Sequence, residues 1–338
     1  MLRSFTSRQV LYRQVLCRQV LALAAAALAL VALPQAASAQ KYPERPVRLV
    51  LPLGAAGVGD ITARIIAERL GDKLGQRFVI ENMPGPGGIV AGRAVLSAPA
   101  DGYTLLLMTG GIASSVPLYN KFPLDMTKDF VAISSMGYFD CLMVVNAQSE
   151  FKTLGDFLKV GREKPGKLNI GTISPGGTQH LAGELFRSTA GIDALVVPHK
   201  TTGEVVIGVR QGSLDIGVDF IAPLISGIKA GDLRALAVTA GKRQPQLPDV
   251  PTANEAGVKG YDVASWNALA APAKTPAAVV KRVHDELAKA LAAPDVQKRF
   301  AELGVEPRSS SPEQLKELFV SESKRWSRVV ESAKIPKQ

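Results

Sequence analysis

Residues 47–60 read VRLVLPLGAAGVGD, and this stretch decides the fold class. The apolar run 47–51 predicts a short buried strand, and the glycine-rich segment 54–59 predicts a loop after it. Beyond the loop, apolar residues recur at helical spacing as far as Leu70, and Asp60 is expected to cap this helix. A strand joined to a helix by a short loop is the repeating unit of a parallel α/β sheet.

The same alternation continues through the chain. Further strands are predicted at 78–80, 103–108, 168–172, 195–197, 214–218, 233–238 and 265–271. Helices are predicted up to Val95 and at 181–189, 205–210, 277–291, 296–303 and 311 to about 331. We therefore expect an α/β fold with mostly parallel sheets and helices on both faces.

The N-terminus predicts export. Residues 1–39 carry four arginines and no acidic residue, and they contain the apolar run 20–33. This run is shorter than the roughly 20 residues that span a bilayer. Ala37-Ser38-Ala39 is a small-residue cleavage motif, so the signal is expected to be removed and the mature chain to begin at Gln40 in the periplasm.

The mature chain has the length of two domains. Removing 39 of the 338 residues leaves 299, against roughly 150 residues for a typical domain. We expect one lobe from residues 40–143 plus 265–338 and a second lobe from 144–264, with a ligand cleft between them.

The composition and the motifs argue against several classes of function. The net charge of +10 falls to +6 once the four signal arginines are removed, and no basic block is interleaved with aromatic residues, which disfavours nucleic acid. Cys141 would be the only cysteine of the mature chain, so no internal disulfide is expected, and it reads as a buried apolar residue. The three histidines lack metal-ligand spacing, and there is no G-x-S-x-G motif. We therefore expect no metal, cofactor or catalytic residue.

Four loops that follow strands are rich in glycine or hydroxyl residues, at 54–59, 109–111, 174–178 and 199–203. Ligands of open parallel sheets bind at the carboxyl ends of the strands, and the free N–H groups of helix starts bind anions. Such turns are also common without a ligand, and that structural reading stays open. Gly57 is expected to need a left-handed backbone. The candidate ligand-binding residues are Ala56, Gly57, Val58, Gly59, Asp60, Thr109, Ser174, Gly177, Thr178, His199 and Asp219.

A dinucleotide-dependent oxidoreductase is a remote alternative. The loop 54–59 is followed about 20 residues later by a strand ending in Glu81, which is the layout of a dinucleotide-binding unit. However, the glycines are spaced G-x-x-G-x-G instead of G-x-G-x-x-G. An exported protein also has no nicotinamide pool to use.

Several segments resemble the Bug family, the receptors of tripartite tricarboxylate transporters. They include RPVRLVLP at 45–52, VIENMPG at 79–85, PADGYTLL at 99–106 and LPDVPT at 247–252, in the family's order along the chain. The resemblance implies a two-lobed periplasmic binding protein of type II, with no enzymatic activity. It implies a small carboxylate ligand held by backbone amides, hydroxyls and waters, and a monomer that meets membrane transporter subunits transiently. A receptor that serves a signalling system remains an alternative.

The chain also departs from the family pattern. The family's first loop usually reads P-F-x-P-G-G-x-T-D, whereas residues 52–60 read PLGAAGVGD. Ile89 replaces a common asparagine, His199 replaces a tyrosine, and Glu204 stands where a small or apolar residue is usual. Glu204 is expected either to meet an amine of an amino-acid-like ligand or to lie on the surface. The ligand is thus left open among di- and tricarboxylates, aromatic carboxylates and amino-acid-like molecules.

Overall fold

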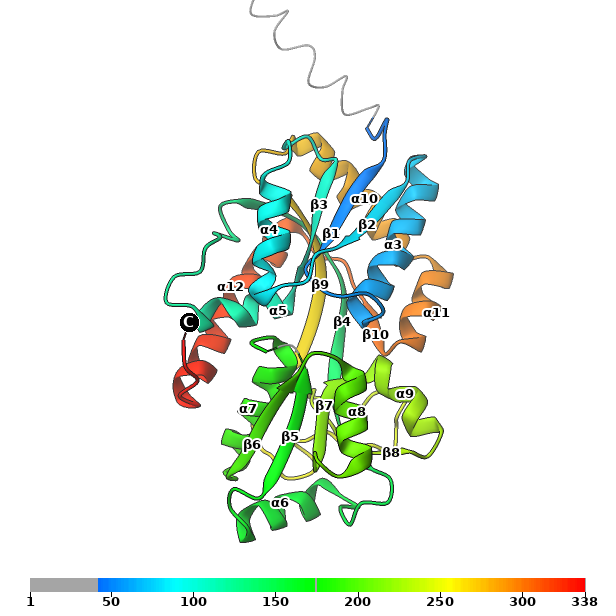
Figure 1. Ribbon diagram of the computed structural model, residues 1–338. Coiled ribbons are helices and arrows are strands. Elements are labelled where there is room, and N and C mark those ends of the chain that lie inside the picture. Colours follow the sequence, from blue (N-terminus) through cyan, green and yellow to red (C-terminus); the bar gives the residue numbers. More distant parts are fainter. Residues whose placement is uncertain (1–41, 174, 338) are drawn as a thin grey trace, which may run out of the picture. The chain divides into compact units, whose positions relative to one another are not determined.

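The computed structural model describes residues 42–173 and 175–337, and residues 45–338 form one compact unit (Figure 1). The predicted export signal, its cleavage site before Gln40 and the candidate residue Ser174 lie outside the described residues.

The strands of this unit form a sheet in the order β2-β1-β3-β9-β4-β7-β5-β6, with β8 and β10 paired to β4. β1 is parallel to β2 and β3, and β5 is parallel to β6 and β7. β9 and β4 run antiparallel to their neighbours and join the two parallel sets. The strands are β1 (Val47–Leu51), β2 (Phe78–Asn82), β3 (Thr104–Thr109), β4 (Phe130–Asn146), β5 (Leu168–Ile173), β6 (Ala194–His199), β7 (Ile216–Phe220), β8 (Leu233–Val238), β9 (Ala264–Pro272) and β10 (Val305–Pro307).

Helices lie beside both parallel sets (Figure 1). They are α3 (Val58–Leu74), α4 (Ile89–Leu96), α5 (Gly110–Ser115), α6 (Leu154–Glu163), α7 (Thr178–Ala190), α8 (Thr202–Gln211), α9 (Ile221–Lys229), α10 (Ala277–Leu291), α11 (Pro294–Glu302) and α12 (Pro312–Ser332), with 3-10 turns η1 (Pro86–Gly88) and η2 (Val116–Leu118). α12 connects two cores. Phe319 packs in the cluster that holds Val50 of β1, and Trp326 packs in the cluster that holds Leu181 of α7.

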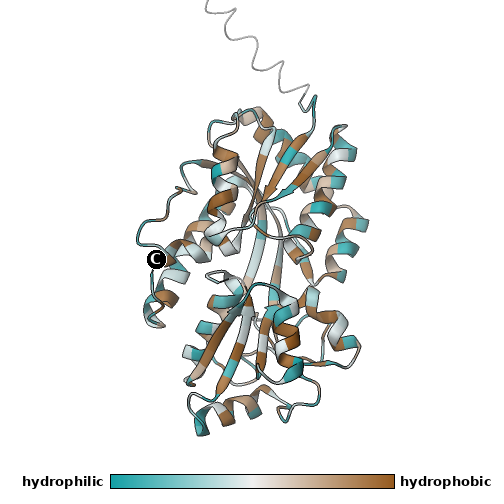
Figure 2. Ribbon diagram, in the orientation of Figure 1, coloured by the Kyte–Doolittle hydropathy of each residue, from teal (hydrophilic) through white to brown (hydrophobic). Residues whose placement is uncertain are grey.

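β4 is the longest strand described, and the sequence analysis predicted no strand in this segment. Its first part, Phe130–Asp140, pairs with β9, and its last part, Cys141–Asn146, pairs with β7 and β8. Serines, a glycine and an aspartate interrupt the apolar pattern between residues 134 and 140, and the long central strands are pale in the middle of the view in Figure 2. Because both faces are covered, these polar residues are buried and the alternation that reveals a half-exposed strand is absent.

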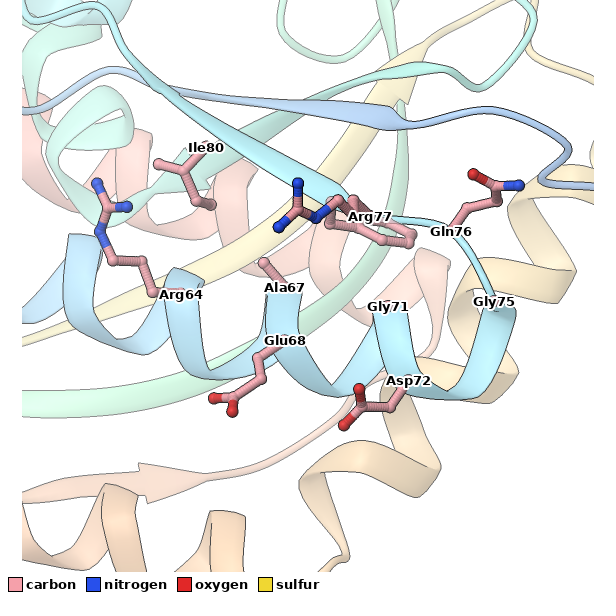
Figure 3. A pocket seen from close by; sticks show the side chains of 10 residues that line it. Arg64, Ala67, Glu68, Gly71, Asp72, Gly75, Gln76, Arg77 and Ile80 are labelled. Atoms are coloured by element: carbon pink, nitrogen blue, oxygen red, sulfur yellow. The ribbon is translucent and has the colours of Figure 1, made fainter.

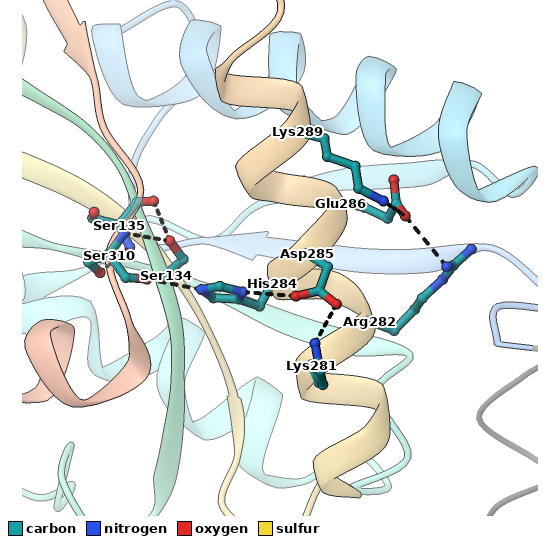
Figure 4. A network of polar contacts seen from close by, with 9 residues as sticks. All are labelled: Ser134, Ser135, Lys281, Arg282, His284, Asp285, Glu286, Lys289 and Ser310. Carbon is teal, nitrogen blue, oxygen red and sulfur yellow. Dashed lines mark hydrogen bonds and ion pairs between the residues drawn. The ribbon is translucent and has the colours of Figure 1, made fainter.

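Two serines of β4 form hydrogen bonds with a distant segment (Figure 4). Near a register shift in β4, the N–H of Ser135 donates to Ser310 Oγ at 3.0 Å, and the N–H of Ser310 donates to Ser134 Oγ at 3.0 Å. His284 of α10 reaches the same segment, with Nε2 at 3.1 Å from the carbonyl oxygen of Ser310. Because the imidazole meets a carbonyl and not a serine hydroxyl, this network fixes the start of α12 and does not form a nucleophile–base pair.

Some of the other helices were predicted correctly, and others were not predicted. The helices at 277–291 and 311–331 are confirmed as α10 and α12, and α12 begins with a capping box between Ser311 and Gln314. α6 and α9 were missed. The helix α6 does carry a sequence signal, a capping box between Thr153 and Asp156, whereas Pro223 and Gly227 obscure the pattern of α9.

Candidate functional site

The first candidate loop ends at the start of α3. Gly57 precedes the helix with φ −79°, and no side chain accepts the N–H groups of the first turn. Two expectations were therefore wrong. Asp60 is the third residue of the helix and not its cap, and the residue in the left-handed region is Ala56, with φ 67°, and not Gly57.

Asp60 is buried and holds this loop to the sheet. Its carboxylate accepts the N–H of Ala56 at 2.9 Å, the side-chain amide of Asn82 at 3.0 Å, and two donors of Arg64 at 2.9 and 3.0 Å. Burial raises the pKa of Asp60, but the hydrogen bonds from Arg64 and Asn82 outweigh it and leave the pKa below its ordinary value. The carboxylate is thus saturated by protein donors, while the amides of Val58 and Gly59 have no side-chain partner.

The left-handed Ala56 gives a testable consequence. A residue with a Cβ is destabilised by about 1–2 kcal/mol in the left-handed region. Glycine avoids this penalty, but it loses more conformational entropy on folding, which cancels part of the gain. Ala56→Gly should therefore raise the free energy of unfolding by about 1 kcal/mol, measured by urea denaturation. The matched control is Ala55→Gly, since Ala55 is equally exposed but has no positive φ. Equal effects of both substitutions would contradict the assignment.

The start of α7 resembles the start of α3. Gly177 precedes the helix with φ −81°, and no side chain caps it. His180 instead accepts the N–H of Gly176 through Nδ1 at 3.1 Å, and burial lowers the pKa of His180, which favours the neutral acceptor form. The carbonyl of Gly176 accepts the hydroxyl of Ser115 at 3.0 Å, which docks the loop onto α5.

Both helix starts meet β9. Ser265 and Asn267 lie two residues apart on this strand, on the same face, and each is 2% exposed. The Oγ of Ser265 lies 3.4 Å from Oγ1 of Thr178, the first residue of α7. The side-chain amide of Asn267 donates to Thr62 of α3 at 3.2 Å, and a Cβ on Gly59 would lie 3.2 Å from the same nitrogen. The sequence interpretation missed both β9 residues, although two polar residues within an apolar strand were the available signal.

Thr109 also lies beside Ser265 and Asn267 of β9, but its side chain already accepts a hydrogen bond within the protein. Its Oγ1 caps α5 by accepting the N–H of Ile112 at 3.3 Å. The next residue, Gly110, packs closely on β9, since a Cβ there would lie 2.7 Å from Ser265 Oγ.

The remaining candidates lie at the carboxyl ends of β6 and β7, the two strands that flank β5. Asp219 is 1% exposed and accepts hydrogen bonds from the hydroxyl of Thr202, its neighbour Phe220 and the side chain of Gln179. His199 ends β6 and is partly exposed. Glu204 is exposed and accepts the N–H of Lys200 at 3.0 Å, as a first-turn acid of α8 does, which favours its surface interpretation.

A pocket of about 640 Å³ lies elsewhere, between α3 and the start of β2 (Figure 3). Its rim carries charges of both signs, including Arg64, Glu68 and Arg77, and none of the predicted site residues lines it. Arg64 is already paired with Asp60, and Glu68 with Arg299 at 2.9 Å. This hollow therefore offers neither the free amides nor the glycines of the candidate loops.

The part of the chain that the structure describes contains no group of three or more His, Cys, Asp or Glu side chains able to hold a metal ion. Within the same residues, every helix is too short or too polar to cross a membrane.

Solved structures define the class of the protein as a two-lobed α/β binding protein. R. palustris Rpa4515 with adipate superposes with a TM-score of 0.82 and is 33% identical, covering 88% of this chain and 100% of the other. MatC from Rhodopseudomonas palustris with bound malate gives 0.77 and 30%, covering 86% and 100%.

Residues 62–335 match the family model described as the tripartite tricarboxylate transporter family receptor, and the chain belongs to this family. Protein BugT of Bordetella pertussis is 30% identical over 295 residues, covering 87% of this chain and 90% of BugT. The resemblance to the Bug family is thus confirmed, and the protein is a solute-binding receptor.

Proposed function

We propose that this receptor binds a small carboxylate in the periplasm, at the starts of α3 and α7, and delivers it to membrane transporter subunits without chemical change. The observation that carries the proposal is the meeting of two uncapped, glycine-preceded helix starts at one pair of polar residues on β9. The adipate of the Rpa4515 structure and the malate bound to MatC agree with this ligand class.

The physical reason is the unsatisfied backbone of a helix start. The first N–H groups of a helix have no partner within the helix, and the helix dipole adds a partial positive charge of about half an elementary charge. Glycines before each helix let a ligand approach closely. Two such helix starts supply several donors to one carboxylate, so that no lysine or arginine is needed to neutralise it.

We propose that the two lobes are residues 40–143 plus 265–338 and residues 144–264, and that they close on the ligand. The change of partner within β4, between Asp140 and Cys141, and the start of β9 at Ala264 support these boundaries. The contact of Thr178 with Ser265 would then join one lobe to the other. Closure requires that the ligand bind the closed state better than the open state.

The proposal is tested with protein purified from the periplasmic fraction. Native mass spectrometry should give a chain that begins at Gln40, accompanied by a small retained ligand. Adipate or malate should raise the melting temperature of the emptied protein, and nicotinamide cofactors should not. Retention of residues 1–39, or stabilisation by the cofactors alone, would contradict the proposal.

A further inference from the structure

We propose that Asp219 is a positioning residue, which aligns the start of α7 with the start of α8 and so directs the free amides of α7 at the ligand. This inference rests on the proposed function. It differs from the expectation of the sequence, in which Asp219 contacts the ligand itself.

The contacts of Asp219 connect three elements at the carboxyl end of β7. Its Oδ1 accepts the N–H of Phe220 at 2.7 Å and the side-chain amide of Gln179 at 3.3 Å. Its Oδ2 accepts the hydroxyl of Thr202 at 2.5 Å. Gln179 is the second residue of α7 and Thr202 is the first residue of α8, so one carboxylate fastens both first turns to the same strand.

The carboxylate of Asp219 is already satisfied by protein donors. The residue is 1% exposed, and both carboxylate oxygens already accept hydrogen bonds from protein donors. Thr178 is equally buried but points its hydroxyl at Ser265, on the side of the free amides. The carboxylate of Asp219 therefore acts through the helix that it holds.

The electrostatics of Asp219 agree with a geometric role. Burial raises its pKa, and hydrogen bonds from Thr202, Phe220 and Gln179 oppose that shift without any cationic partner. A buried carboxylate without a cation is costly and repels an anionic ligand nearby. At the start of α3, Asp60 makes similar contacts to a loop amide and a side-chain amide, but there Arg64 neutralises it.

The chain offers a matched control on the same strand. Asp215 lies just before β7, at the opposite end from Asp219, and accepts the N–H of Asn169 at 2.7 Å. Burial raises the pKa of Asp215 as well. Asp215→Ala thus removes a partly buried carboxylate next to β7, and Asp215 has no hydrogen bond to α7 or α8 among the described contacts.

The test compares Asp219→Ala, Asp219→Asn and Asp215→Ala by amide hydrogen exchange and by calorimetry with adipate and with malate. The N–H of Leu181 makes the first backbone hydrogen bond of α7, to Gly177, and reports whether the first turn is held. In Asp219→Ala, exchange at Leu181 should be about tenfold faster and affinity about tenfold weaker or worse, since several hydrogen bonds to a charged group are lost. Asp219→Asn should restore both values to within a few fold, because the amide oxygen still accepts from Phe220 and Gln179.

Two results would overturn the inference. Unchanged exchange at Leu181 in Asp219→Ala would show that Asp219 does not hold α7, whatever the affinity. The same acceleration in Asp215→Ala would show a general loss of stability. If the wild type binds neither adipate nor malate, the proposed function fails for these probes, and the exchange at Leu181 still decides the role of Asp219.

Discussion

Asp140→Asn is expected to raise the free energy of unfolding at pH 7 by about 2–3 kcal/mol and to change it little near pH 4. Asp140 lies in β4, immediately before the strand changes partners, and is 7% exposed. Burial raises its pKa to about 6, and the nearby carboxylates of Asp262 and Glu306 add to the shift, while Gln244 and Lys242 oppose it.

The sign follows from the linkage between protonation and folding. The pKa of Asp140 in the folded protein, about 6, exceeds the ordinary value of 3.8, so the folded state prefers the protonated carboxyl. The stabilisation is complete below pH 3.8 and is lost as the pH rises through about 6. Asparagine keeps an oxygen that accepts from Gln244 and carries no charge at either pH, so it removes the penalty only at neutral pH.

Urea unfolding of the wild type and the variant at pH 4, 5.5 and 7 measures this difference. Asp262→Asn serves as the control, because Asp262 is an exposed carboxylate of the same cluster. A gain in Asp140→Asn that is the same at all three pH values would show that the buried charge is not its source.

Thr178→Val should weaken carboxylate binding roughly ten- to a hundredfold and leave stability nearly unchanged. A hydrogen bond from a neutral donor to a charged group contributes about 1.5–3 kcal/mol, and valine keeps the shape of the side chain. The hydroxyl of Thr178 contacts only Ser265 among the described residues, at 3.4 Å, which is too long for a strong bond. Little folding energy is therefore lost with it.

Lys200→Ala tests the alternative model, in which a cationic side chain holds the ligand carboxylate by a salt bridge. Lys200 is exposed and follows the end of β6, so it is the cationic side chain within the fourth candidate loop. Calorimetry with the same carboxylate should give an affinity within a few fold of the wild type. Loss of binding in Lys200→Ala, with little effect of Thr178→Val, would assign the ligand to a salt bridge.

The sequence located the elements whose signals are local. β1, its loop and α3 follow from an apolar run, a cluster of glycines and helical periodicity. β4 was not predicted, because the hydrogen-bond partners of its polar residues are distant in the sequence. Ser134 and Ser310, for example, are 176 residues apart. No pattern within a short window contains such a partner.

In the candidate site too, local features could be predicted from the sequence and long-range contacts could not. Glycine and hydroxyl content identified the loops, but not the direction of each group. The role of Asp60 in α3 depends on Asn82 at the end of β2, and the left-handed residue of the loop is an alanine. Ser265 and Asn267 were missed because their partners Thr178 and Thr62 lie 87 and 205 residues away.

The most direct measurement of how the ligand is held is an NMR titration of backbone amides with adipate or malate. If the carboxylate binds the helix starts, the amide protons of Val58, Gly59 and Gln179 should shift downfield and saturate together with the calorimetric isotherm. Saturable binding that leaves these three amides unmoved, with shifts confined to lysine or arginine side chains, would contradict the binding of a carboxylate by α3 and α7.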